Sequence, residues 1–115
     1  MKYEVSQGRK PEDVGKLNLG YDVRSIDQVF KHRYIEVKGR KGADGQVFLT
    51  RNEYFKLRQL GRDAYLYVVI NCETDHPELF IIHDPGKVLH PIEVPAGVRY
   101  KVTMQDWKRT AERIE

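Results

Sequence analysis

The run Ala64–Ile70, which reads Ala-Tyr-Leu-Tyr-Val-Val-Ile, constrains the fold of this chain more than any other segment. It is rich in β-branched and aromatic residues and shows no alternation of polar with apolar positions, so it predicts a strand that is buried on both faces. Such a strand lies in the middle of a mixed sheet that is covered on both sides. The run is too short to cross a bilayer, and we expect no membrane association.

The segment before this strand has the signals of a helix. Thr50 is a good N-cap and Glu53, three residues later, completes a capping box, which predicts a helix over Arg51–Leu60 that ends at Gly61. The positions on its apolar face are Tyr54, Leu57 and Leu60.

Alternation and turn residues predict the remaining elements. The predicted strands are Leu19–Ile26, Arg33–Gly39, Gln46–Leu49, Glu78–Ile82 and Val98–Thr103. We expect a short first helix, a loop over Gln7–Asp13, a turn at His83–Gly86 and a last short helix around Trp107, capped by Thr103 and Asp106. The order is a helix, a three-stranded meander, a crossover helix and further strands, which predicts an α/β sandwich. Residues 1–115 are long enough for one domain, and the stubby first helix suggests a piece of a larger protein.

Charge is distributed unevenly along the chain. Residues 1–63 contain 14 Lys and Arg against 9 Asp and Glu, whereas residues 64–115 contain 6 against 8. The densest basic stretch, Lys31–Lys41, is typical of a surface that binds a polyanion, and equally of a solvated basic hairpin. Cys72 is the only cysteine, so no internal disulfide can form, and together with an N-terminus that lacks a secretory signal this favours a cytoplasmic protein.

Asp22, Glu36 and Lys38 are the candidate chemical group. Glu36 and Lys38 alternate with Val37 and therefore project from the same face of their strand, and a hairpin with the preceding strand would bring Asp22 next to Glu36. Two carboxylates with a neighbouring lysine are what a metal-dependent phosphodiesterase needs. The spacing by itself is also typical of alternating charges on a solvated strand.

Three blocks of sequence carry a family resemblance: Gly20–Ser25, Tyr34–Arg40 and Leu49–Glu53. They resemble the PD-(D/E)XK nuclease superfamily, in particular a branch of uncharacterised domains at the C-terminal end of helicase-like or restriction-type proteins. The similarity continues through Asp63–Val69, His83–Pro85 and Asp106–Trp107. The resemblance implies a restriction-endonuclease-like mixed sheet, in agreement with the order of elements above.

The resemblance also implies a site. Asp22 and Glu36 would be ligands of Mg²⁺ or Mn²⁺, the carbonyl oxygen of Val37 a further ligand, and Lys38 the catalytic lysine. Glu4, on the first helix, matches the place of a glutamate that often joins the metal ligands in this superfamily.

The function expected from these residues is metal-dependent cleavage of nucleic-acid phosphodiester bonds, with DNA as the expected substrate. The alternative is a non-catalytic nucleic-acid-binding or docking module of a helicase or defence assembly, in which the partner is a helicase or ATPase region of the same or another protein. The expected phosphate contacts are Arg24, Arg40, Lys41 and Arg51. Glu53 and Asn52 could approach the site from the start of the crossover helix, although a capping role for Glu53 is favoured.

Overall fold

The computed structural model describes residues 2–94 and 99–115. Its elements follow the chain in the order α1 (Lys2–Ser6), β1 (Lys10–Asp13), η1 (Gly15–Leu17), β2 (Val23–Ile26), β3 (His32–Gly39), β4 (Val47–Thr50), α2 (Arg51–Leu60), η2 (Gly61–Asp63), β5 (Ala64–Ile70), β6 (Glu78–His83), α3 (Pro85–Val88), β7 (Ile92–Val94), β8 (Arg99–Val102), α4 (Met104–Lys108) and β9 (Glu112–Ile114).

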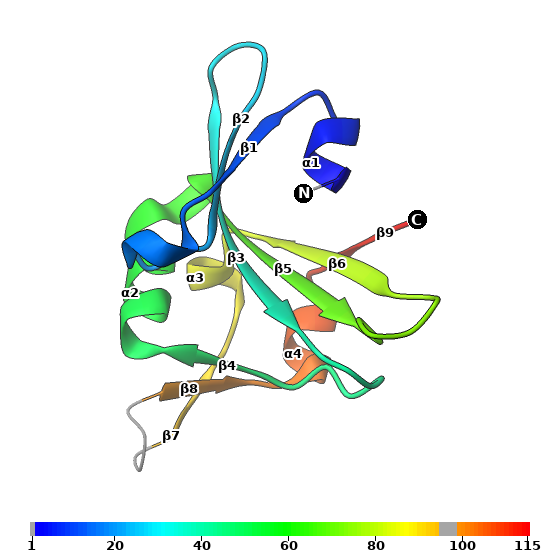
Figure 1. Cartoon of the computed structure of the whole chain (residues 1–115). Helices are drawn as coiled ribbons and strands as arrows, with labels where there is room; N and C mark the ends of the chain where they lie inside the picture. The colour runs from blue at the N-terminus through cyan, green and yellow to red at the C-terminus, as the bar shows by residue number, and fades with distance from the viewer. Residues whose placement is uncertain (1, 95–98) are drawn as a thin grey trace.

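A mixed sheet forms the centre of the molecule (Figure 1). Within residues 2–94 and 99–115 it contains six strands in the order β1-β2-β3-β5-β6-β9. β5 pairs in parallel with β3 and antiparallel with β6, and its side chains are buried along most of its length. This confirms the strand that the apolar run predicts and its place inside a mixed sheet. The parallel pair requires a crossover connection, which β4 and α2 provide.

The predicted strand Gln46–Leu49 forms as β4, but it does not belong to the central sheet. β4 pairs instead with β8, and β8 pairs with β7, in a separate small sheet. The chain turns away at Gly45, whose carbonyl oxygen accepts a hydrogen bond from the buried indole Nε1 of Trp107 at 2.7 Å. A Cβ at position 45 would lie 2.4 Å from the Trp107 ring, so only glycine permits this approach. The meander of the central sheet is therefore β1-β2-β3.

Other boundaries also differ from the predictions. β1 lies inside the predicted loop Gln7–Asp13. It was not predicted as a strand because a short charged edge strand that contains a proline has no alternating pattern of apolar residues. The strand predicted over Leu19–Ile26 is reduced to β2. β7, β9 and α3 were not predicted as such, and the first residue of the predicted strand Val98–Thr103 lies outside the described residues.

Two hydrophobic cores cover the two faces of the central sheet. The larger core joins β5 and β6 to α2, β4, β8 and α4, and its buried members are Val47, Leu49, Leu57, Ala64, Leu66, Val68, Ile70, Phe80, Ile82, Leu89, Val102 and Trp107. The smaller core contains Val23, Ile35, Tyr67 and Ile81, with Tyr3 of α1 packed against it. The sheet thus separates α2 from α1, which lie on different sides of the strands in Figure 1.

The helix caps agree with the predictions. The Thr50 hydroxyl accepts a hydrogen bond from the Glu53 backbone N–H at 3.1 Å, and the Glu53 carboxylate accepts one from the Thr50 backbone N–H at 2.8 Å. Thr103 caps α4 through the Asp106 backbone N–H. Among the described residues, no helix combines the length and apolar character needed to cross a membrane.

Candidate functional site

The hairpin of β2 and β3 brings Asp22 to Glu36, as the sequence predicts. Val23 pairs with Ile35, so Asp22, immediately before β2, is opposite Glu36. The Asp22 backbone N–H donates to the Ile35 carbonyl oxygen at 2.9 Å, and the Asp22 Oδ2 accepts from the Val37 backbone N–H at 2.9 Å. The backbone and the carboxylate of Asp22 are therefore both anchored to β3.

A cavity of about 200 Å³ opens at these carboxylates. Its lining residues are Gly15, Asn18, Leu19, Gly20, Tyr21, Asp22, Glu36, Thr50, Asn52 and Glu53. Gly20 has a φ of +89°, and a Cβ there would lie 2.8 Å from the Cβ of Lys56. Glycine at this position thus lets the segment before Asp22 approach α2 and close the cavity on that side.

Glu36 is a buried carboxyl group, with 2% of the residue exposed. Burial, then a hydrogen bond with Glu53, then the charges of Glu53 and Asp22 raise the pKa of Glu36 to about 9. Among the described residues no partner reaches the buried Glu36 Oε2 atom. An uncompensated buried oxygen is costly, and here it lies in a group that lines a cavity beside a second carboxylate.

Lys38 and Glu53 complete the cluster. The Lys38 Nζ atom lies 3.0 Å from Glu53 Oε1 and 3.5 Å from Glu36 Oε1. Burial lowers the pKa of Lys38, but the hydrogen bond to Glu53 and the neighbouring carboxylates outweigh it and leave the pKa above its usual value. Lys38 therefore remains a cation beside Glu36. Glu53 is the capping-box partner of Thr50 at the start of α2, and it also accepts a hydrogen bond from the Lys38 ammonium. The capping role favoured from the sequence is therefore only one of its two roles.

This arrangement fits a hard divalent cation. In residues 2–94 and 99–115, no group of three or more His, Cys, Asp or Glu side chains is placed to hold a metal ion. Mg²⁺, however, is commonly held by one or two carboxylates and keeps several water ligands. Asp22 and Glu36 supply two carboxylates on one cavity, and the Glu36 oxygen without a partner is a ready ligand.

The structure does not bring Glu4 to this cavity. Glu4 is fully buried on the opposite face of the sheet, where Arg9 donates two hydrogen bonds to it at 2.6 and 2.9 Å and the Tyr67 hydroxyl donates a third at 2.6 Å. Burial raises the pKa of Glu4, but the hydrogen bonds from Arg9 and Tyr67 outweigh it and hold the pKa below its usual value. The expectation that Glu4 joins Asp22 and Glu36 as a metal ligand is corrected accordingly: Glu4 anchors α1 to the sheet.

The four expected phosphate contacts are dispersed. Arg24 lies on β2, two residues after Asp22, and its Nη2 atom is 2.6 Å from Glu12 Oε1. Arg40 and Lys41 follow the far end of β3, where the exposed Lys41 is 3.8 Å from Glu73. The guanidinium of Arg51 lies over the ring of Phe55, 5.4 Å from its centroid. Arg51 lies between the lining residues Thr50 and Asn52, whereas Arg24 is two residues from Asp22 and the Arg40–Lys41 pair lies beyond the end of β3.

The buried Glu36 predicts a pH dependence of stability. The folded chain retains the Glu36 proton up to about pH 9, whereas the unfolded chain releases it near 4.5, so stability should fall as the pH rises between these values. Glu36→Gln removes this loss. Its free energy of unfolding, relative to the unsubstituted chain, should increase by roughly 5 kcal/mol from about pH 5 to about pH 9, because each pH unit between the two pKa values contributes about 1.4 kcal/mol.

Urea unfolding in the presence of a chelator measures this difference. Glu93→Gln, at an exposed position of β7, is the matched control and should show no such change. Parallel pH profiles for Glu36→Gln and the unsubstituted chain would contradict the environment described for Glu36.

Comparison with known proteins relates this chain to one family model and to solved structures. Residues 1–82 match the model of the family described as Protein NO VEIN, C-terminal. The chain is also similar to the solved structure of Archaeoglobus fulgidus Hjc, described as a Holliday junction resolvase from an archaeal hyperthermophile, with a TM-score of 0.65, 17% sequence identity, and coverage of 98% of this chain and 84% of that chain. Comparison with curated protein sequences gives no significant match. The structural likeness confirms the restriction-endonuclease-like fold.

Proposed function

This chain belongs to the family of the C-terminal domain of Protein NO VEIN, and from that premise we propose that it is a metal-dependent nuclease domain that hydrolyses phosphodiester bonds of nucleic acid, with DNA as the expected substrate. One observation carries the proposal: Asp22 and Glu36 line a single cavity, and the ammonium of Lys38 lies 3.5 Å from Glu36. The nuclease-like fold supports it.

Each side chain has a role that its surroundings allow. Asp22 and Glu36, with the carbonyl oxygen of Val37, would hold Mg²⁺ or Mn²⁺. The cation would acidify a bound water and offset the charge of the phosphate. Lys38 keeps its proton beside Glu53 and offers a fixed positive charge where negative charge grows in the transition state. Glu53 positions Lys38 and, through its cap, ties that position to the start of α2.

Other phosphates of the substrate would contact the basic residues Arg24 and Arg51, near the cavity, and Arg40 and Lys41, beyond the end of β3. Such contacts position a substrate without reading its sequence. The net charge of +3 and its concentration in the first half of the chain favour a polyanionic substrate. An association with helicase-like proteins remains an expectation from the resemblance.

A cleavage assay tests the proposal. The purified chain is incubated with single-stranded, duplex and branched DNA and with RNA, each with Mg²⁺, with Mn²⁺, or with a chelator. We expect cleavage of at least one substrate that requires the cation and disappears in Asp22→Asn, which rules out a contaminating nuclease.

The non-catalytic module would be favoured if the chain binds nucleic acid, and binds Mn²⁺ by calorimetry, but shows no metal-dependent cleavage in any of the mixtures. Cleavage that persists unchanged in Asp22→Asn would refute the assignment of the site.

A further inference from the structure

The loop between β2 and β3 presents two apolar side chains to solvent. Val29 is 78% exposed and Phe30 is 79% exposed. The loop is held closed by its own hydrogen bonds: the Asp27 Oδ1 atom accepts from the backbone N–H groups of Val29 and Lys31, both at 2.9 Å, and the Asp27 backbone N–H donates to the Lys31 carbonyl oxygen at 3.1 Å. The two side chains are thus displayed on an ordered turn.

Phe30 is held there against its backbone preference. Its φ is +64°, in the left-handed region that bulky residues rarely adopt and that suits Gly or Asn. The exposed ring gives little to the cores. Strain at an exposed aromatic side chain points to a use outside the fold.

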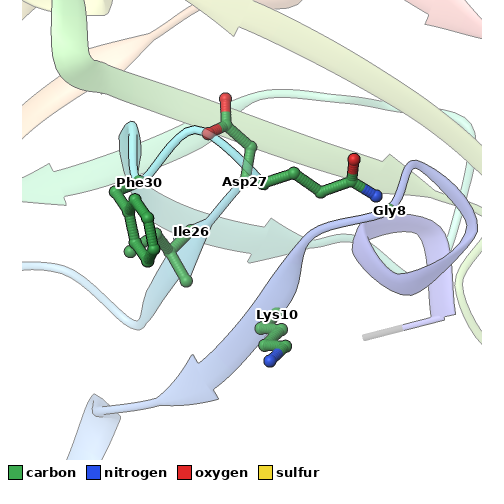
Figure 2. A pocket seen from close by; sticks show the side chains of 6 residues that line it. Gly8, Lys10, Ile26, Asp27 and Phe30 are labelled. Atoms are coloured by element: carbon green, nitrogen blue, oxygen red, sulfur yellow. The ribbon is translucent and has the colours of Figure 1, made fainter.

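The ring borders a hollow that continues along the sheet. Phe30 and Ile26 lie on one side of a hollow of about 350 Å³, with Lys10 across from them (Figure 2). Lys10 and Ile26 also line a second hollow, of about 240 Å³, that reaches His32 and Arg24. The two hollows therefore form one surface across β1, β2 and β3.

This surface shares its sheet face with the carboxylate cavity. His32, Tyr34 and Glu36 alternate along β3 and project to the same side. The His32 and Tyr34 rings are stacked, with centroids 5.8 Å apart and planes 11° apart, and the Tyr34 ring meets the edge of Tyr21, which lines the cavity. His32 and Glu36 are four positions apart on β3, which corresponds to about 13 Å at a rise of about 3.3 Å per residue.

The charged residues around the loop between β2 and β3 favour binding of a polyanion. In the described part of the chain, Lys10 and Lys31 take part in no salt bridge, whereas Asp27 is occupied by the loop backbone and Glu12 by Arg24. A second copy of this chain would bring the same cations face to face, which argues against self-association at this surface.

We propose that Phe30 and the stacked His32–Tyr34 pair bind unpaired bases of a nucleic-acid strand whose backbone continues to the carboxylate cavity, an inference that rests on nucleic acid being the substrate proposed above. Aromatic side chains stack on any base, because every base has a π-face. Lys10 and Lys31 neutralise neighbouring phosphates. The substrate class is accordingly nucleic acid with single-stranded bases near the scissile bond, rather than fully paired duplex.

The test is a binding measurement in a chelator, where cleavage cannot occur. The probes are a single-stranded oligonucleotide that contains 2-aminopurine and a blunt duplex of the same sequence. Phe30→Asn removes the ring and suits the left-handed backbone, so the variant should fold at least as well as the unsubstituted chain. Its affinity for the single strand should fall about tenfold, the loss of one base–aromatic stack, and 2-aminopurine quenching should diminish.

Two control variants show whether the loss of affinity is specific to the aromatic ring of Phe30. Phe30→Tyr should retain the affinity and the quenching, and Ile92→Asn, which removes a 51% exposed apolar side chain on β7, should change neither. Duplex affinity should change little in any variant. Equal single-strand affinity in Phe30→Asn and the unsubstituted chain overturns the inference, as does absence of single-strand binding.

Self-association is the competing outcome. Phe30→Asn that alters the sedimentation of the chain and leaves oligonucleotide affinity unchanged would assign the surface to a second copy and also overturn the inference. Failure of the proposed nuclease activity is detected separately, by metal-dependent cleavage and its response to Asp22→Asn, because binding in a chelator does not depend on the metal site.

Discussion

Asp22→Asn should abolish calorimetric binding of Mn²⁺ while the chain remains folded. The asparagine side-chain oxygen can still accept the hydrogen bond from the Val37 backbone N–H that Asp22 Oδ2 accepts at 2.9 Å, so the geometry of the hairpin should survive. One of the two carboxylates on the cavity is lost, and with it a charged ligand. Without a cation, the free energy of unfolding should stay equal or rise, since the charge of Asp22 disfavours ionisation of Glu36.

Asp44→Asn is the matched control for this experiment. Asp44 also accepts one backbone hydrogen bond, from Gln46 at 3.1 Å, but it lies outside the cavity. Its variant should bind Mn²⁺ as the unsubstituted chain does. Because Glu36 must release its proton to bind a cation, the affinity of Asp44→Asn and of the unsubstituted chain for Mn²⁺ should increase with pH. Unchanged Mn²⁺ affinity in Asp22→Asn would show that Asp22 is not a metal ligand and would refute the proposed site.

Lys38→Ala should reduce the cleavage rate by at least roughly a hundredfold, as expected for the loss of one preorganised charge beside the reacting group. The ammonium acts on charge that develops in the transition state, so the rate should suffer more than ground-state binding. Affinity for nucleic acid should fall only slightly, by the share of one charge among many. Single-turnover cleavage and a binding titration of the same variant separate the two effects.

Lys87→Ala, at an exposed lysine of α3, is the control and should cleave normally. Lys38→Arg keeps the charge and tests whether charge alone suffices at this position. Should the unsubstituted chain and Lys38→Ala cleave at the same rate, Lys38 is not the catalytic lysine. Should both be inactive and differ slightly in affinity, Lys38 is only a phosphate contact, as the non-catalytic alternative requires.

Much of the fold could be predicted because its signals are local. The capping box at Thr50 and Glu53, the stop at Gly61 and the apolar run Ala64–Ile70 each depend on near neighbours, and the bounds of α2 and β5 agree with them. β1 and β9 have no such signal. Short edge strands are polar and form because a partner strand offers its backbone groups, which no local pattern records.

The candidate site divides in the same way. Alternation along β3 sufficed to place Glu36 and Lys38 on one face, and the hairpin followed from the two adjoining strands. The double role of Glu53 could have been inferred only weakly, from its position at the start of a helix near the site. The separation of Glu4 from Asp22 and Glu36 could not have been inferred from the sequence, since it depends on which face of the sheet α1 covers.

The sequence alone therefore determined the helix α2 with its caps, the buried central strand and the pairing of Asp22 with Glu36. These depend on side-chain period, caps and turns, which act over a few residues. Only the tertiary structure decided that β4 leaves the central sheet, that Glu4 is bound by Arg9 and Tyr67, and that Glu53 holds Lys38. The contacts of Tyr67 with Glu4 and of Lys38 with Glu53 join residues 63 and 15 positions apart. The places of β4 and Glu4 depend on the choice between partner strands or between the two faces of the sheet, and local preferences do not distinguish those alternatives.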